Sequence, residues 1–310
     1  MCLRPKMIVN RHYVKVAGSL SAACNHFFNR PDFLIKVDCG LCVECMDKAA
    51  ASWRTRLIDE YHYYQKQYPH RKIHFVTLTI APEFYSEFTK SRSHSIQLIR
   101  KFFERYRKRY GCSFKHYLTS EYGEKRGRLH FHMISFGMLC DVRELRKLWS
   151  YGRVDMSILE GPKGCTYVAG YINKGVKQAK LYFIDNEKKG FRCVSPGIGL
   201  CYTLDASNRD YHVQHNSPVY LRQQSNGCPV PLPRYYLAKL FSPVDLYRRR
   251  IEFLRQSFEL PRPPYRANHR QFGTLRSLFV YLHSVGGSPV LRDEQLKLLD
   301  FQTLKSYFYG

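Results

Sequence analysis

Two histidines and an upstream carboxylate are the residues of this sequence best suited to chemistry. His130 and His132 alternate with apolar residues in the stretch 129–133, and this period of two predicts a strand. Successive side chains on a strand point to opposite faces, so the two imidazoles share one face. Residues 116–121 read as an earlier strand and a glycine-containing turn follows, which predicts a hairpin. Glu121 would then lie across from His130.

Such a trio could hold a metal ion. Two imidazoles and one carboxylate leave coordination positions open for water or substrate, and this mixture suits Mn2+ and accepts Mg2+ when phosphate oxygens complete the shell. Glu124 is an alternative ligand, although its place in the turn favours a solvated charge. The plainer interpretation is a pair of surface histidines on an amphipathic strand.

A pair of tyrosines follows downstream. If residues 167–174 are helical, Tyr167, Tyr171 and Lys174 share one face. Packing of both tyrosines into a core, with the lysine solvated at its edge, is the alternative. Gly170 costs a helix about 1 kcal/mol relative to alanine, which suggests that another group approaches this face closely.

Together these motifs resemble the HUH endonucleases, specifically the two-tyrosine branch that initiates rolling-circle replication. The stretch 130–132 is similar to the family's His-hydrophobe-His motif, and 167–174 to its Tyr-x3-Tyr-x2-Lys motif. Residues 75–80, with Thr-Leu-Thr at their centre, look like its first motif. The resemblance covers roughly residues 36 to 205.

Two further motifs narrow the resemblance to initiators of small circular single-stranded DNA phages of the gokushovirus type (Microviridae). Those proteins carry a Cys-x2-Cys-x2-Cys, seen here as Cys39, Cys42 and Cys45, and a Pro-Gly-Ile-Gly, seen here at 196–199. The cysteine spacing suits structural zinc, which usually takes four ligands. The fourth is left open among Cys24, Cys193, Cys201 and a histidine, and three reduced cysteines opening a helix are the alternative.

The predicted order of elements is β-α-β-β-α-β-α, which fits an α+β fold, an antiparallel sheet with helices packed on one face. The resemblance implies the same HUH or RRM-like palm. It also implies a metal-dependent nickase: Glu121, His130 and His132 hold Mg2+ or Mn2+, while Tyr167 and Tyr171, aided by Lys174, cut and rejoin one DNA strand through a 5′-phosphotyrosine. We expect residues 1–190 to form the nuclease domain with the cysteine cluster, and residues 191–310 a basic region packed on it or following it.

The composition supports a polyanionic partner. The chain has 310 residues, 50 Lys+Arg against 25 Asp+Glu, a net charge of +25 and 15% aromatic residues, and charge with stacking surfaces suits unpaired DNA. The candidate contacts are Thr77, Thr79, Arg105, Arg107, Arg126, Arg128 and Lys177. The two threonines could instead support the metal site or reflect strand propensity.

Other features bound the setting. No apolar run approaches the ~20 residues that span a bilayer, there is no secretory signal, and eleven cysteines without one predict reduced thiols in a bacterial host cytoplasm. No phosphate-binding Gly-x4-Gly-Lys-Ser/Thr loop occurs, so we expect a host helicase and DNA polymerase to act with the protein at the origin, in single-stranded and replicative-form viral DNA. The competing functions are a non-catalytic basic nucleic-acid-binding or packaging protein, and a transposase or relaxase with the same site.

Overall fold

The computed structural model describes residues 2–29, 33–123, 127–178, 190–215, 219–220, 230–242 and 244–246. The chain divides into two compact units. The first contains Met1 and Gly40–Arg250, and the second contains Cys2–Cys39 and Ile251–Gly310. The domain boundary expected near residue 190 stays a prediction. In the described part of the chain, no helix is both long enough and apolar enough to span a bilayer.

The described part of the second unit is a small α/β element. Strands β1 (Lys6–Val9) and β2 (Leu34–Val37) pair antiparallel, as the apolar stretches at 7–9 and 33–37 predict. Helices α1 (Arg11–Ala17) and α2 (Leu20–Phe27) connect them. Val9, Ala23 and Phe33 form the buried centre of this unit.

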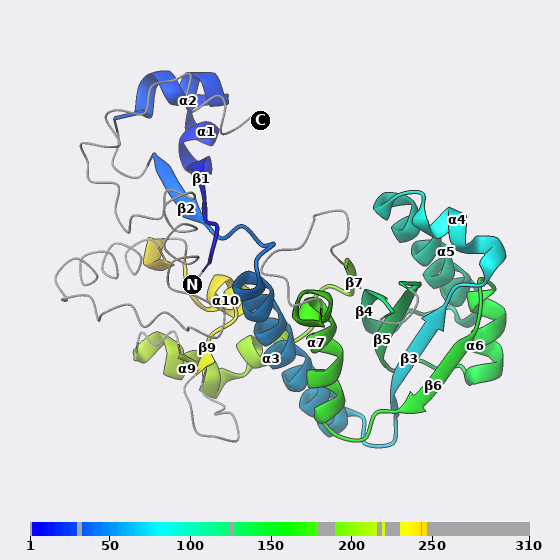
Figure 1. The fold of residues 1–310 in the computed structure, drawn as a ribbon. Helices are drawn as coiled ribbons and strands as arrows, with labels where there is room; N and C mark the ends of the chain where they lie inside the picture. The colour runs from blue at the N-terminus through cyan, green and yellow to red at the C-terminus, as the bar shows by residue number, and fades with distance from the viewer. Residues whose placement is uncertain are drawn as a thin grey trace. The chain divides into compact units, whose positions relative to one another are not determined.

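A five-stranded sheet is the centre of the first unit (Figure 1). Its order is β6-β3-β5-β4-β7, and every pair is antiparallel. The strands are β3 (Ile73–Thr79), β4 (Lys115–Tyr122), β5 (Leu129–Phe136), β6 (Val154–Ile158) and β7 (Arg192–Val194). The predicted β4–β5 hairpin is confirmed, and so is the α+β class.

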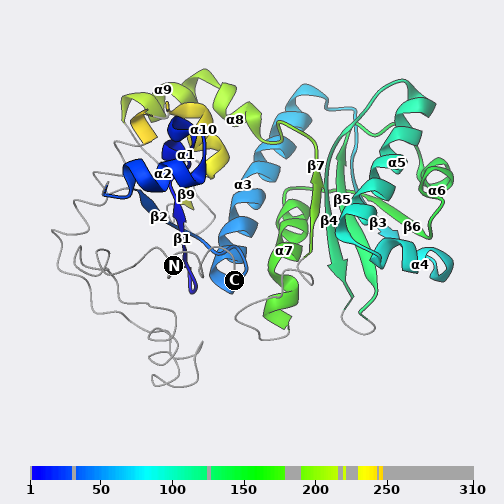
Figure 2. The same cartoon turned by 90° about the horizontal axis from the view of Figure 1, so that it is seen from above.

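Helices cover both faces of this sheet, so the expectation of helices on one face was wrong. Figure 2 shows α3 (Val43–Gln67) and α7 (Lys163–Gln178) on one side. On the other side lie α4 (Pro82–Thr89), α5 (Arg92–Tyr110) and α6 (Val142–Trp149). The reason lies in the strands, whose alternate residues are apolar on both faces: Phe131 packs on the α5 side and Ile134 on the α3 side.

The helix ends follow local rules. Asp141 caps α6 by accepting a hydrogen bond from the Glu144 N–H at 2.8 Å, as predicted. Ser91 caps α5 in the same way, so this helix begins four residues before the predicted Ile96. It ends at Gly111, whose φ of 68° is a left-handed conformation that glycine adopts without strain.

The Pro-Gly-Ile-Gly turn docks on α3. Arg56 donates to the Ile198 carbonyl at 2.9 Å, and the Gly199 N–H donates to Glu60 Oε2 at 2.8 Å. Gly199 has a φ of 76°, and a Cβ there would press on the Arg56 backbone and on the hydroxyl of Tyr236. This motif therefore has a structural role. Arg56, which the sequence suggested for phosphate contact, is buried beneath it.

The turn leads into short elements of the same unit. These are α8 (Leu200–Leu204), α9 (Ala206–Gln214), the paired strands β8 (Val219–Tyr220) and β9 (Val230–Pro231), and α10 (Arg234–Leu240). The sequence predicted one helix over 235–258, and this was wrong at Phe241, which is extended with φ −117° and ψ 145°. Pro243 follows closely and disfavours helix before it. The predicted helix at 293–308 lies outside the described residues.

His116 should make stability depend on pH. Its ring stacks on Phe103 with centroids 3.8 Å apart, and burial lowers its pKa from 6.5 to about 4. Between these values the unfolded chain binds a proton that the folded chain does not. The free energy of unfolding therefore falls as pH falls from about 6.5 to about 4, by roughly 3 kcal/mol from this residue.

Replacing this imidazole tests the effect. We predict that His116→Phe loses less stability than the wild type between pH 7 and pH 4.5, measured by urea unfolding. The matched control, His70→Phe at an exposed histidine, should keep the wild-type pH dependence. An unchanged pH dependence in His116→Phe would contradict the assignment.

Candidate functional site

The strand register brings the predicted ligands together. Glu121 is the direct partner of His130 across the β4–β5 pair, and His132 follows on the same face. Glu121 Oε2 lies 3.1 Å from His130 Nε2 and 2.8 Å from His132 Nε2. The carboxylate and His132 are buried, whereas the His130 side chain is 21% exposed, so the trio opens to solvent on the His130 side. The alternative ligand Glu124 lies outside the described residues.

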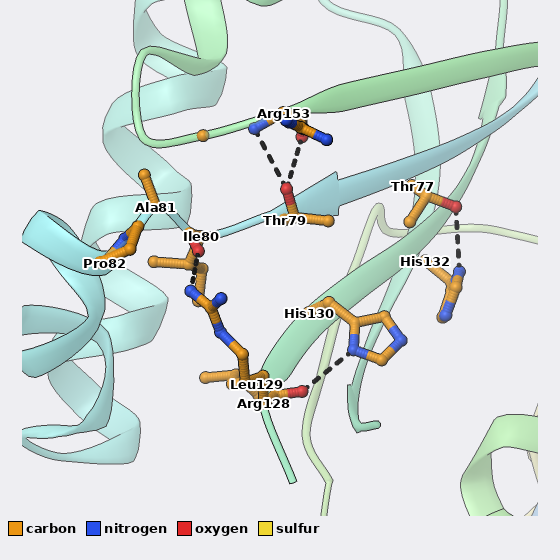
Figure 3. Close-up of a pocket in the computed structure, with 11 residues that line it drawn as sticks. Thr77, Thr79, Ile80, Ala81, Pro82, Arg128, Leu129, His130, His132 and Arg153 are labelled. Atoms are coloured by element: carbon orange, nitrogen blue, oxygen red, sulfur yellow. Dashed lines mark hydrogen bonds between the residues drawn. The ribbon is translucent and has the colours of Figure 1, made fainter. Parts of the chain in front are cut away.

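Contacts at the other ring nitrogens orient both imidazoles. His130 Nδ1 lies 3.1 Å from the Arg128 carbonyl, which can only accept, so Nδ1 carries the proton and Nε2 offers its lone pair. His132 Nδ1 lies 3.3 Å from Thr77 Oγ1 (Figure 3). With Nδ1–H donating to that hydroxyl, His132 also directs an Nε2 lone pair at the trio, and Thr77 becomes a support of the site.

This donor set fits a divalent cation. One ligand atom from each residue of the trio lies within 4.8 Å of the others, and two nitrogens with one carboxylate oxygen suit Mn2+ or Mg2+ that keeps open positions. The oriented Nε2 atoms are what a metal ligand requires. The identity of the metal stays a prediction.

The two tyrosines of α7 have different surroundings. Tyr171 is 7% exposed and lies flat on His132, with ring centroids 4.0 Å apart and planes 5° from parallel. Phe75 stacks on His132 as well, at 5.6 Å and 6°. Tyr167 is 58% exposed and meets Phe75 and Tyr171 edge-on. The predicted core packing therefore applies to Tyr171 alone, and the pair lies beside the metal ligands.

Other predicted residues of this helix are placed in part. Lys174 and Lys177 belong to α7, so Lys174 follows Tyr171 by one turn, but the structure does not describe their side chains. A Cβ at Gly170 would meet nothing within 4 Å. The inferred close approach at Gly170 was therefore wrong for the described residues. Arg126 lies outside them.

The remaining candidate DNA contacts separate into two groups. Arg128 and Thr79 line a cavity beside the histidines, together with Thr77. Arg105 instead donates to the Leu148 carbonyl at 2.8 Å, which gives it an internal role between α5 and α6. Arg107 is exposed on α5, the helix layer opposite the tyrosine helix.

One basic residue of the cavity was missed. Arg153 lines it from the loop before β6, and no motif or periodicity of the sequence singled out that loop. A lone arginine after a glycine carries no such signal, because only the β3–β6 pairing brings it to the histidines.

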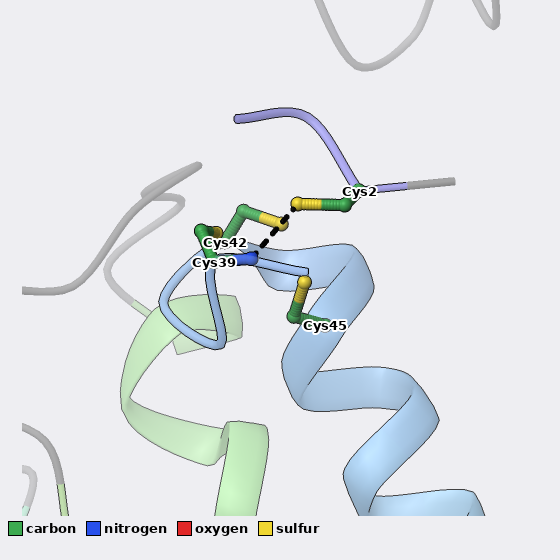
Figure 4. A group of neighbouring side chains, drawn as sticks. All are labelled: Cys2, Cys39, Cys42 and Cys45. Atoms are coloured by element: carbon green, nitrogen blue, oxygen red, sulfur yellow. Dashed lines mark hydrogen bonds between the residues drawn. The ribbon is translucent and has the colours of Figure 1, made fainter. Parts of the chain in front are cut away.

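The predicted zinc motif spans the boundary of the two units along the chain. In the second unit the Cys39 N–H donates to Cys2 Sγ at 3.3 Å, so Cys2 is the companion that the sequence missed (Figure 4). In the first unit Cys42 precedes α3 and Cys45 lies in its first turn, with their sulfurs within 4.8 Å.

The other candidate zinc ligands are less suitable. Burial raises the pKa of Cys193 to about 11 and that of Cys201 to about 12, which disfavours the thiolate that zinc requires. Cys24 packs in the apolar centre of the second unit. Zinc stays a prediction. A zinc assay of purified protein tests it, and Cys39→Ser should lower the bound zinc whereas Cys193→Ser should not.

Comparison with known proteins points to phage replication. Residues 73–176, which carry the sheet, the histidines and the tyrosines, match the family model of the replication-associated protein ORF2. Replication-associated protein ORF4 of Chlamydia phage 1 is 28% identical over 246 residues, which cover 68% of this chain and 55% of that relative. The chain thus spans about half the length of the relative. No solved structure matches the chain.

Proposed function

We propose that this chain is a phage replication initiator that nicks one strand of a DNA origin through a tyrosine, on an HUH or RRM-like palm. Its similarity to replication-associated proteins supports the role in replication. The observation that carries the chemistry is the stack of Tyr171 on His132, with ring centroids 4.0 Å apart. This contact sets a helix with two candidate nucleophiles directly against the candidate metal ligands.

The proposed reaction is a transesterification. The Tyr171 or Tyr167 oxygen forms a bond to phosphorus, and the bond from phosphorus to the 3′ oxygen breaks. The phenol gives up its proton, and the leaving 3′ oxygen gains one. The products are a 5′-phosphotyrosine and a free 3′-OH that can prime a polymerase. Because the new ester keeps the energy of the broken one, rejoining needs no nucleotide cofactor.

The residues of the site have distinct tasks in this scheme. Glu121, His130 and His132 would hold Mg2+ or Mn2+, which supplies charge neutralisation at the scissile phosphate. Thr77 and Phe75 hold the His132 ring. Lys174 is proposed to favour the phenolate, since an unperturbed tyrosine has a pKa near 10.

Two tyrosines permit a second cleavage while the first stays attached to DNA, as unit-length circles require. The proposed partners are single-stranded and replicative-form origin DNA, with a host helicase and DNA polymerase in the bacterial cytoplasm. The net charge of +25 suits the DNA partner.

A cleavage assay tests this function. Labelled single strands spanning the cognate origin are incubated with the full chain and Mn2+, Mg2+ or EDTA, and resolved on a denaturing gel. We expect one defined nick with metal and none with EDTA. Salt-sensitive binding without any cleavage under either metal would reject the nickase, and would favour a non-catalytic basic nucleic-acid-binding protein.

A further inference from the structure

The metal ligands form one wall of a cavity of about 730 Å³. Besides the histidines, it is lined by the end of β3, the segment into α4, the start of β5 and the loop before β6: Thr77, Thr79, Ile80, Ala81, Pro82, Arg128, Leu129, Gly152 and Arg153. Its volume lies within the usual range for small-molecule sites. None of these described lining residues is acidic.

The cavity combines an apolar part with two cations. Ile80, Ala81, Pro82 and Leu129 supply the apolar surface. Figure 3 shows the Arg128 and Arg153 side chains on either side of the Thr79–Ile80 segment, with His130 between them and His132. An apolar surface next to guanidinium groups suits a nucleobase and its phosphates.

Arg128 is held in place by its surroundings. One of its guanidinium nitrogens donates to the Ile80 carbonyl at 3.0 Å, and the group lies 5.6 Å from the centre of the Tyr85 ring. A guanidinium has five N–H donors. The described residues accept from one nitrogen of Arg128, so the remaining donors can serve a phosphate.

Arg153 has a fixed backbone and an exposed side chain. Its N–H donates to Thr79 Oγ1 at 3.1 Å, and its carbonyl accepts from the Thr79 hydroxyl at 3.2 Å and the Thr79 N–H at 2.9 Å. Gly152 lets the loop approach this closely, because a Cβ there would collide with the Thr79 carbonyl. The Thr79 hydroxyl therefore positions Arg153, and the arginine side chain is the group offered to a ligand.

We propose that this cavity binds one unpaired nucleotide next to the scissile phosphate, with its base on the apolar surface and its phosphates on Arg153 and Arg128. The inference rests on the proposed function and deepens it by making single-stranded DNA the substrate. A base in a duplex must leave its stack to enter such a pocket, whereas an unpaired base enters at little cost. A continuous path from Arg153 to His130 then leads the strand to the metal ligands.

Binding without cleavage tests this inference separately from the nickase. The full chain is titrated in EDTA against fluorescent single-stranded oligothymidylate, the matching duplex, and an abasic oligomer of equal length and charge. We expect the single strand to bind at least about tenfold tighter than the abasic oligomer, since stacking contributes strongly per base. It should also bind tighter than the duplex.

Variants assign the phosphate contact. Arg153→Ala should weaken binding of oligothymidylate about five- to tenfold and lower its salt slope by about 0.7, the value for one phosphate contact on a single strand. Arg153→Lys should restore the slope. Arg143→Ala, at an exposed arginine of α6, should bind within about twofold of wild type.

Two results would overturn the inference. One is equal affinity for oligothymidylate and the abasic oligomer, which would leave no base in the cavity. The other is unchanged affinity and salt slope in Arg153→Ala with an unchanged melting temperature. Either result leaves the nickase standing if the cleavage assay succeeds, whereas absence of cleavage with intact base-dependent binding would reject the nickase alone.

Discussion

Glu121→Gln is expected to lower the rate of DNA cleavage about 1000-fold, because losing a Lewis-acid contribution of several kcal/mol costs a factor of ten for each 1.36 kcal/mol. Glu121 Oε2 lies within 3.1 Å of both histidine Nε2 atoms, so it is the anionic member of the trio. The amide keeps the shape of the side chain and removes its charge. The loss should therefore arise from metal binding rather than from unfolding.

The measurement has two parts. Cleavage rates are compared at saturating Mn2+, and Mn2+ affinity is measured by calorimetry on protein without DNA. Glu83→Gln, at an exposed glutamate in the first turn of α4, is the matched control and should leave both quantities unchanged. Wild-type cleavage and Mn2+ affinity in Glu121→Gln would contradict the assigned metal site.

The second large effect concerns the tyrosine hydroxyls. We expect Tyr167→Phe/Tyr171→Phe to show no detectable cleavage, since both candidate nucleophiles are gone. Each single phenylalanine variant should keep one nucleophile and cut the strand once. Because the phenylalanine ring that replaces Tyr171 would still stack on His132, Mn2+ affinity should remain within about twofold of wild type in all three variants.

Tyr171→Ala separates the hydroxyl from the ring. Tyr171 covers one face of His132 at a centroid distance of 4.0 Å, and contacts that orient metal ligands typically contribute 10- to 100-fold in affinity. We expect Tyr171→Ala to lose about that much Mn2+ affinity, whereas Tyr167→Ala, at the exposed tyrosine, should not. Equal Mn2+ affinity in both alanine variants would show that the stack does not position His132.

Local patterns were enough to predict the hairpin and the trio. A period of two places His130 and His132 on one face, and a turn between two strands sets Glu121 opposite His130. Helical spacing likewise placed Tyr167 and Tyr171 on α7. These features depend on neighbours close in sequence.

Features set by tertiary pairing were not predictable in this way. Strand alternation does not say which helix covers which face, so the second helix layer was missed. Arg153 reaches the histidines only through the pairing of β3 with β6. Arg105 has the composition of a DNA contact, yet its guanidinium packs between two helices. Charge on a helix in sequence does not reveal where that charge points.

The central claim is that a tyrosine of α7 becomes joined to DNA. The most direct test is mass spectrometry of the protein after incubation with origin single strands and Mn2+, followed by protease digestion and peptide mapping. The proposed function predicts a nucleotide adduct on the peptide containing Tyr167 and Tyr171, formed only with metal and absent from the double phenylalanine variant. Cleaved DNA without any adduct on that peptide, or an adduct on another residue, would contradict it.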